Sequence, residues 1–339
     1  MLGGMSIHSI DAKRPPIVRD IVVVGGSAGG LSTLGGVLSR LPEDCRAAIF
    51  VVLHIPDDRP SRVAEVLQKC CAMPVRFGED EQPIEPGTVT VAQRDAHLLL
   101  GVRHVHLRRG PRENGFRPAI DPLFRSAVVN QGGRAIGVIV SGALHDGASG
   151  ARALSRVGAP ILVEHPDRAE YPQLPLAVSD IVDDARCLAI ADLSAALVET
   201  IGTPGRPSVD VPEDVRLELM VSTLEKARMS TEHRLGALTP FNCPDCNGVL
   251  WEIEDGPMVR YRCHTGHAFT SDVLENVQEK EVERKLYEAL RAQRERAHLL
   301  RSMAARAPDE RGRSRLEGRA EGYDEDSSMI ESLLLSRAS

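Results

Sequence analysis

The chain has 339 residues, of which 42% are hydrophobic and 26% are charged, and its formal net charge is -7 at pH 7. This composition is ordinary for a soluble protein, and the length allows one large core and a smaller unit. The acidic balance excludes nucleic acid or an anionic membrane as an electrostatic partner. Because no stretch resembles a signal peptide or a membrane helix, we expect a cytoplasmic protein with no direct membrane insertion.

Residues 21–30, with the sequence IVVVGGSAGG, place one hydroxyl group in a glycine cluster after a β-branched run. Such a run predicts a buried parallel strand, and the apolar spacing of residues 31–41 predicts a helix after it. The glycines do not have the spacing of a dinucleotide fingerprint, whereas residues 25, 27 and 29 match G-x-S-x-G. Ser27 is therefore a nucleophile on a strand-to-helix turn or, alternatively, the N-cap of a helix.

Two later apolar runs also end in reactive side chains. Residues 47–53 predict a strand that ends at His54, and residues 134–140 predict a strand followed by a turn of small residues that contains Asp146. Between them, four short runs at 75–77, 88–91, 97–100 and 104–107 predict an antiparallel extension of the sheet. Strands and helices alternate to about residue 200, which predicts an α/β fold.

Three reactive side chains thus stand at the carboxyl ends of predicted strands, where open α/β sheets bind their ligands. A serine hydroxyl becomes a nucleophile when a base takes its proton and a third group orients that base. Ser27, His54 and Asp146 therefore predict a Ser-His-Asp hydrolase. The alternative for His54 is a purely structural role, and the order Ser, His, Asp differs from that of the α/β-hydrolase fold.

Four motifs in this order resemble the catalytic domain of the CheB-type protein-glutamate methylesterases, over about residues 19–195. They are Gly-Gly-Ser27-Ala-Gly-Gly, His54-Ile-Pro at a strand end, Phe116-Arg-Pro-Ala-Ile-Asp-Pro-Leu-Phe-Arg-Ser126, and Ser141-Gly-Ala-Leu-His-Asp146-Gly-Ala148. The resemblance implies a doubly wound, mainly parallel sheet. It also implies a serine-type carboxylic ester hydrolase that acts in chemotaxis signal transduction.

The resemblance assigns roles to individual residues. Ser27 would be the nucleophile, His54 the general acid and base, and Asp146 its orienting group. Backbone N–H groups of Ala28 and Ala143 would hold the oxyanion. The implied reaction hydrolyses glutamate γ-methyl esters on the cytoplasmic domains of methyl-accepting chemoreceptors, releasing methanol without a catalytic cofactor, and some family members also deamidate glutamine.

The motif at 116–126 would shape the substrate site; its alternative is a Pro-started helix packed on the sheet. The candidate substrate-shaping residues are Phe116, Arg117, Asp121 and Arg125.

Two departures from the family concern regulation and specificity. The residues before Ile21 are too few for the usual receiver domain. We therefore expect either a constitutively open site or control by the C-terminal unit or a separate regulatory protein. The turn before Asp146 also differs from many members at residues 143–145.

A second motif lies near the C-terminus, where Cys243 and Cys246 form a C-x2-C pair and Cys263 follows with two histidines. Four soft or borderline ligands of this kind close a tetrahedron around structural zinc. The ligands would be the three cysteines with His267, or with His264 instead; the C-x3-H spacing favours His267. The alternative is a cluster of reduced cysteines. We expect the metal to be dispensable for ester hydrolysis.

The remaining pattern predicts the domain organisation. A composition rich in Pro and Gly predicts a linker after residue 200, and a charged amphipathic helix is predicted from about residue 271 to 305. A competing hypothesis is a non-catalytic zinc-containing adaptor that binds receptors or signalling proteins. The expected parts are an N-terminal extension (1–18), the catalytic domain (19–200), a linker (201–214), a helical and zinc-binding unit (215–305) and a charged, disordered tail (306–339), in which a short terminal helix at 329–335 is the one candidate element.

Overall fold

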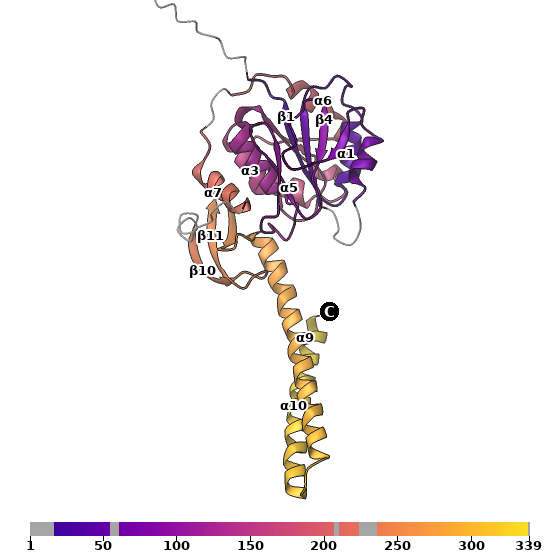
Figure 1. Ribbon diagram of the computed structural model, residues 1–339, viewed down its shortest axis with the longest axis vertical. Helices are drawn as coiled ribbons and strands as arrows, with labels where there is room; N and C mark the ends of the chain where they lie inside the picture. The colour runs from indigo at the N-terminus through magenta and orange to yellow at the C-terminus, as the bar shows by residue number, and fades with distance from the viewer. Residues whose placement is uncertain (1–16, 55–60, 207–209, 224–235, 338–339) are drawn as a thin grey trace, which may run out of the picture. The chain divides into compact units, whose positions relative to one another are not determined.

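A parallel sheet of seven strands, in the order β3-β4-β2-β1-β7-β8-β9, forms the centre of residues 17–206, which we call the sheet domain (Figure 1). The computed structural model describes residues 17–54, 61–206, 210–223 and 236–337. All six strand pairings in this sheet are parallel. The strands are β1 (Ile21–Gly26), β2 (Ala48–Leu53), β3 (Val75–Phe77), β4 (Thr88–Val91), β7 (Ala135–Ile139), β8 (Ile161–Glu164) and β9 (Arg186–Leu188).

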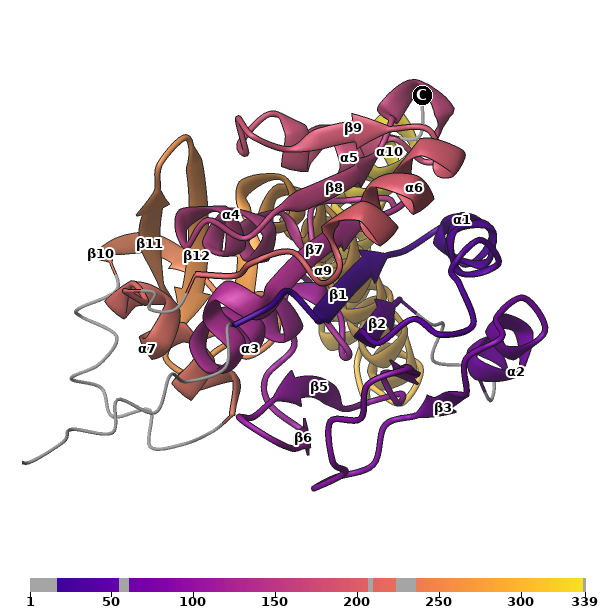
Figure 2. The same ribbon diagram turned by 90° about the horizontal axis from the view of Figure 1, so that it is seen from above.

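Helices cover both faces of the sheet, as Figure 2 shows from above. Along β1, Ile21 and Val23 point into one apolar cluster, whereas Val22 and Val24 point into the other. This alternation explains why the strand is apolar throughout. The first cluster packs against α3 (Ile120–Gln131), α4 (Ala148–Arg156) and α5 (Gln173–Ser179), and the second against α1 (Gly30–Leu38), α2 (Val63–Gln68) and α6 (Ile190–Thr200). The predicted doubly wound α/β fold is confirmed.

The strand order reverses at β1. The chain leaves β1 through α1 to reach its neighbour β2, and it later returns through α3 to β7 on the other side of β1. Connections that depart to opposite sides leave a crevice at the carboxyl ends of the central strands. The carboxyl ends of β1, β2 and β7 meet there.

The predicted antiparallel extension of the sheet is wrong. Strands β3 and β4 join the main sheet in parallel, because residues 78–87 cross over and return the chain in the same direction. Strands β5 (His97–Leu100) and β6 (Val105–Arg108) form a separate antiparallel hairpin. Leu98 and Leu100 of this hairpin join the core that contains Leu123 of α3, so the hairpin lies on one face of the sheet domain and does not extend it.

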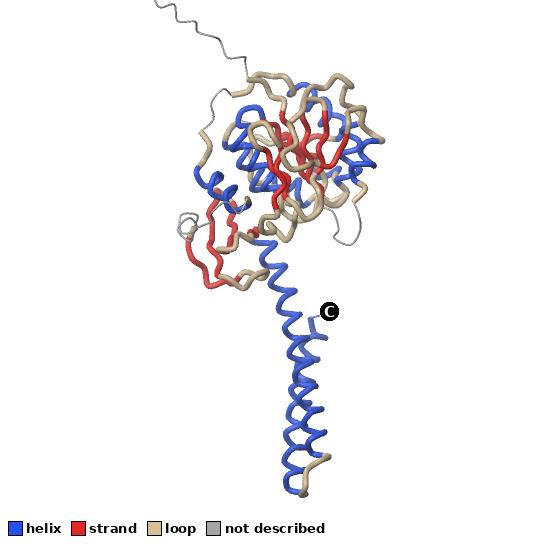
Figure 3. The backbone as a smooth tube through the Cα atoms, viewed as in Figure 1, coloured by secondary structure: helices blue, strands red, loops and turns tan. Residues whose placement is uncertain are grey.

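An antiparallel ribbon of four strands follows helix α7 (Glu213–Ser222) and is visible in red beside the sheet domain (Figure 3). It consists of β10 (Ala237–Asn242), β11 (Val249–Asp255), β12 (Met258–Cys263) and β13 (Ala268–Thr270). Residues 1–273 form one compact unit and residues 274–339 a second. The expected boundary near residue 200 is therefore corrected, because the ribbon belongs with the catalytic sheet.

The expected linker, 201–214, is also shorter than predicted. The backbone N–H of Gly205 donates to Ile17 and that of Arg19 donates to Thr203, so this segment is bound to the start of the catalytic domain. Helix α7 begins at Glu213, inside the expected linker. The expected extension, 1–18, lies outside the described residues except for its last two positions, and so do linker residues 207–209.

The second unit contains most of α9 (Ser271–Ala304) and all of α10 (Glu310–Arg337). The predicted helix at about 271–305 is confirmed, and the candidate terminal helix at 329–335 lies within α10. The prediction that the tail before it is disordered is wrong. Ala297 and Leu300 of α9 pack against Leu316, Ala320 and Tyr323 of α10. These three tail residues are spaced four and three apart, so a narrow apolar stripe within a charged sequence stabilises the second helix. Among the described residues, the longest helices are too polar to cross a membrane.

Candidate active site and metal centre

Ser27 lies on the turn between β1 and α1. Its backbone N–H donates to Ser141 O at 3.0 Å, which ties this turn to the loop after β7. Gly29, with φ of 74°, is the N-cap of α1, and a Cβ atom there would lie 2.6 Å from Ser141 Oγ. The turn therefore requires glycine at this position. No side chain caps this described helix, so the N-cap alternative for Ser27 is wrong and its hydroxyl is available for another contact.

The structure brings Ser27, His54 and Asp146 together at the carboxyl edge of the sheet. His54 Nδ1 lies 3.0 Å from Ser27 Oγ, and His54 Nε2 lies 2.8 Å from Asp146 Oδ2. The carboxylate can only accept, so the imidazole N–H is on Nε2 and Nδ1 offers its lone pair to the serine hydroxyl. The His54 side chain is 5% exposed and that of Asp146 is fully buried. This arrangement can remove a proton from the serine hydroxyl.

Backbone and side-chain donors hold the Asp146 carboxylate in place. Its Oδ2 accepts from Ile120 N at 2.6 Å and its Oδ1 accepts from Asn114 Nδ2 at 3.1 Å. The buried Asp121 lies beside it and accepts from the backbone N–H of Gly150 at 2.7 Å. Burial and the neighbouring Asp146 charge raise the pKa of Asp121 well above its ordinary value. Asp121 therefore anchors the start of α4 next to the candidate catalytic carboxylate.

One of the expected substrate-shaping residues, Phe116, lies against the imidazole, and Arg117 follows it in the chain. The ring of Phe116 stacks on the ring of His54 with centroids 3.5 Å apart and planes 8° apart. Arg117 donates to Asp95 at 2.8 Å. Hydrogen bonds from Arg109 and Arg117 lower the pKa of Asp95 to about 2. Phe116 thus covers one face of the candidate base, while Arg117 fastens the chain next to it.

Asp121 and Arg125, the other two candidate substrate-shaping residues, are 2% and 1% exposed. They could shape the site only through the groups that they hold in place, and this role remains a prediction. Arg125 pairs with Glu113 and, at 3.3 Å, with Glu218 of α7. Burial opposes ionisation of Glu113, but Arg125 and then Arg262 outweigh it and lower the pKa of Glu113 to about 2. Both residues therefore support the framework around the triad.

The candidate oxyanion donors, Ala28 and Ala143, flank the serine. A Cβ atom on Gly142 would lie 3.1 Å from Ser27 Cβ, which places the loop after β7 directly beside the nucleophile. The Gly142 N–H is already used, because it donates to Tyr171 O at 3.0 Å. Within the described part of the chain, the N–H groups of Ala28 and Ala143 donate no hydrogen bond. Their assignment as oxyanion donors remains a prediction.

Two residues of the site have no counterpart in the sequence prediction. Asn114 donates a hydrogen bond to the candidate catalytic carboxylate, and the Asn-Gly pair at 114–115 is a signal for a tight turn that could have located it. Glu164, at the end of β8, accepts from the backbone N–H of Ser141 at 2.7 Å. Burial raises the pKa of Glu164. A glutamate at the end of an apolar strand was its only sequence signal.

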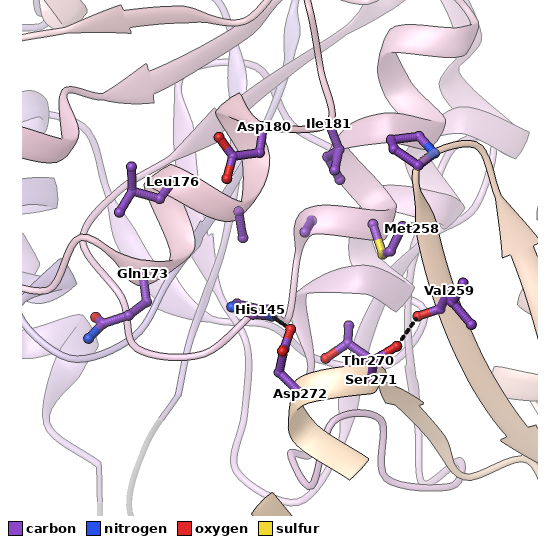
Figure 4. A pocket seen from close by; sticks show the side chains of 13 residues that line it. His145, Gln173, Leu176, Asp180, Ile181, Met258, Val259, Thr270, Ser271 and Asp272 are labelled. Atoms are coloured by element: carbon purple, nitrogen blue, oxygen red, sulfur yellow. Dashed lines mark hydrogen bonds and ion pairs between the residues drawn. The ribbon is translucent and has the colours of Figure 1, made fainter. Parts of the chain in front are cut away.

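A cavity of about 390 Å³ lies between the sheet domain and the ribbon (Figure 4). Its walls include His145, Gln173 and Leu176 from the sheet domain, and Met258 and Asp272 from the other side. His145 Nδ1 lies 2.8 Å from Asp272 Oδ2. None of the triad side chains lines this cavity, so it is a neighbouring space and not the catalytic pocket.

The ribbon brings together the predicted metal ligands Cys243, Cys246, Cys263 and His267, with their donor atoms within 4.8 Å of one another. Cys246 Sγ lies 3.6 Å from Cys263 Sγ, and His267 Nδ1 lies 3.5 Å from Cys263 Sγ. A tetrahedral zinc ion with ordinary bond lengths separates two thiolates by about 3.8 Å and a thiolate from an imidazole by about 3.6 Å. These residues therefore fit a metal ion.

The geometry distinguishes the two histidines that the sequence left open. His267 directs Nδ1 at the sulfur atoms, and its Nε2 lies 4.0 Å from Asp245 Oδ2. His264 instead packs edge-on against Trp251, with ring centroids 6.5 Å apart. The geometry therefore favours His267 over His264 as the fourth candidate ligand.

Comparison with known proteins agrees with the fold. Residues 22–197 match the family model of the CheB methylesterase, which covers about half of the chain. The chain belongs to the CheB methylesterase family. The crystal structure of the Thermotoga maritima CheB methylesterase catalytic domain is similar, with a TM-score of 0.52 and 27% sequence identity, over 54% of this chain and 98% of that one.

Curated relatives match the same region. Protein-glutamate methylesterase/protein-glutamine glutaminase 1 of Bordetella avium is 34% identical over 190 residues, which are 55% of each chain. The corresponding protein of the group 3 operon of Bradyrhizobium diazoefficiens is 35% identical over 154 residues, covering 44% of this chain and 42% of its own. This chain therefore matches about half the length of these relatives or less.

Proposed function

We propose that this protein is a protein-glutamate methylesterase that acts on the cytoplasmic domains of methyl-accepting chemoreceptors. The observation that carries the proposal is the Ser27–His54–Asp146 arrangement, with distances of 3.0 and 2.8 Å, at the switch point of the sheet. Its occurrence in a domain similar to a CheB methylesterase catalytic domain supports this substrate class. The domain needs no cofactor for this reaction.

The chemistry proceeds in two halves. Ser27 Oγ attacks the ester carbonyl while His54 Nδ1 takes the hydroxyl proton, and Asp146 stabilises the imidazolium. The N–H groups of Ala28 and Ala143 would bind the negative oxygen. His54 then gives the proton to the departing methoxide, which leaves as methanol. Water, deprotonated by His54, cleaves the acyl-enzyme to glutamate and regenerates Ser27. The same steps hydrolyse a glutamine side chain, with ammonia as the leaving group.

The test measures methanol release from a methylated receptor cytoplasmic fragment. The wild-type protein should release methanol, and Ser27→Ala should lower kcat by about 10^4- to 10^6-fold. Ser39→Ala is a matched control, because Ser39 lies at the other end of α1. Equal methanol release by the wild type and Ser27→Ala would contradict the proposal.

We also propose that the ribbon holds one structural zinc ion. Three thiolates and one imidazole at tetrahedral spacing prefer zinc, and a ribbon this small gains much of its folding energy from the metal. Freshly purified protein should contain one zinc per chain, and Cys243→Ser should lose the metal and make the ribbon susceptible to proteolysis. Cys70→Ser, at an exposed cysteine outside the cluster, should retain the metal. Purified wild type without metal would contradict this assignment.

A further inference from the structure

The segment Glu113-Asn114-Gly115-Phe116 forms a tight turn between the sheet domain and the ribbon. Asn114 and Gly115 both have positive φ, of 52° and 82°, and the backbone groups of Glu113 and Phe116 bond to each other at 2.9 and 3.2 Å. Positive φ at both central positions is the reason for an Asn-Gly pair here. We call residues 113–116 the Asn-Gly turn.

Asn114 contacts both structures through one buried side chain, which is 4% exposed. Its Nδ2 donates to Asp146 Oδ1 at 3.1 Å and to Asp121 Oδ2 at 3.3 Å. Its Oδ1 accepts from the backbone N–H of Thr270, in ribbon strand β13, at 3.0 Å. The side-chain amide therefore links the candidate catalytic carboxylate directly to the ribbon.

The backbone of the Asn-Gly turn is held by the same strand. The N–H of Asn114 donates to Ala268 O at 2.7 Å, and Glu113 forms a parallel bridge with Ala268. At its other end, the turn carries Phe116, whose ring stacks on His54. One turn thus reaches two members of the triad, and both contacts depend on where strand β13 holds it.

Strand β13 is in turn fixed by the candidate metal site. It begins at Ala268, directly after the ligand His267, and it pairs with β12, which ends at the ligand Cys263. The backbone N–H of Cys263 donates to His267 O at 3.0 Å across this loop. Ligands at both ends of a loop restrict where the following strand can lie.

We propose that Asn114 is a positioning residue through which the metal-bound ribbon orients Asp146. The inference rests on the proposed esterase function and on the zinc assignment. It differs from the expectation that the metal is dispensable for ester hydrolysis, because loss of the ribbon would free the Asn114 amide and the Asn-Gly turn. The effect is on the geometry of the carboxylate, and the metal takes no part in bond cleavage.

The test uses a fluorophosphonate, which labels an activated serine regardless of the natural substrate. The full-length protein and the variants Asn114→Gly, Asn114→Asp and Cys243→Ser are compared, together with the double variant Asn114→Gly/Cys243→Ser. Glycine tolerates the positive φ and removes the amide, whereas aspartate keeps the shape and replaces the donor with an acceptor. Asn130→Ala is the control, because Asn130 Nδ2 donates to Leu100 O at a distant site.

The labelled fraction at completion reports how much protein is folded, and the labelling rate constant reports how well the serine is activated. Loss of a hydrogen bond to a charged group should lower the rate constant about 10- to 100-fold in each Asn114 variant. Asn130→Ala should keep the wild-type value. Cys243→Ser should lower the rate constant comparably, and the double variant should show little further loss.

Wild-type labelling rates in both Asn114 variants would overturn the proposal. Multiplicative effects in the double variant would also overturn it, because the ribbon would then act by another route. A merely structural role would lower the labelled fraction at an unchanged rate constant. If wild type labels normally but releases no methanol from receptor fragments, the proposed substrate is wrong and the positioning role still stands.

Discussion

The sheet domain and its junction with the ribbon are both buried, but they are held together by opposite kinds of side chain. The faces of the sheet are packed with apolar residues such as Val23, Phe50 and Phe124. At the junction, five charged residues are each 5% exposed or less. This buried ionic cluster consists of Glu113, Arg125, Glu218, Arg260 and Arg262.

Glu218 of α7 is central to the buried ionic cluster. Its carboxylate accepts from Arg260 at 2.6 and 2.7 Å and from Arg262 at 3.0 Å. Burial opposes its ionisation, but Arg260 and then Arg125 outweigh this and keep the pKa of Glu218 well below its ordinary value. Apolar packing tolerates many arrangements of similar volume, whereas a buried ion pair tolerates only complementary partners. The buried ionic cluster therefore restricts how the ribbon can pack on the sheet domain more than it adds to the free energy of unfolding.

The largest expected effect is on catalysis and comes from Asp146, the carboxylate that contacts His54. Asp146→Asn should lower kcat for methyl ester hydrolysis by about 10^4-fold, because the amide no longer selects the imidazole tautomer that activates Ser27. The free energy of unfolding should change much less, since the shape is kept. Steady-state kinetics and urea unfolding measure the two quantities. An Asp146→Asn protein with an unchanged kcat and a large loss in the free energy of unfolding would contradict this prediction.

The next effect breaks the buried ionic cluster itself. Glu218→Ala should lower the free energy of unfolding by about 3–5 kcal/mol, because it leaves buried guanidinium groups without their partner. Urea unfolding measures this loss. Glu85→Ala is the matched control, since Glu85 pairs with Arg76 at 2.6 Å but both side chains are largely exposed. That change should cost about 1 kcal/mol or less. Equal losses in the two variants would contradict the comparison.

The pH dependence of stability provides a third test. The pKa of Glu113 is lowered from 4.5 to about 2, so its ionisation stabilises the folded state fully above pH 4.5 and progressively less as the pH falls toward 2. About 2 kcal/mol of this stabilisation should be lost by pH 3. Glu113→Gln removes the titration, so its deficit relative to wild type should shrink between pH 5 and pH 3. A constant deficit in urea unfolding would contradict this.

The smallest effect concerns the apolar contact nearest the chemistry. Phe116→Ala removes the ring that stacks on His54. Such stacks contribute about 0.5–1.5 kcal/mol, so we expect kcat to fall about tenfold or less. Phe116→Tyr keeps the ring and should retain most of the activity. If kcat falls as far in Phe116→Ala as in Asp146→Asn, Phe116 has a larger role than holding the imidazole.

The sequence alone predicted the sheet domain and the residues of the triad because both follow from local patterns. Buried parallel strands are continuous Val/Ile runs, and the residue after such a run lies at the carboxyl edge of the sheet. Ser27, His54 and Asp146 could therefore be located without coordinates. The candidate metal ligands were similarly marked by the spacing of Cys243, Cys246 and Cys263.

Only the tertiary structure decided how these parts combine. The contact between Asn114 and Asp146 joins residues 32 positions apart, and that between Arg260 and Glu218 joins residues 42 positions apart. No periodicity marks a buried charge, because its stability depends on a partner from another element. The part of α10 before residue 329 was missed for the same reason, since its few apolar residues stabilise a helix only when α9 packs against them.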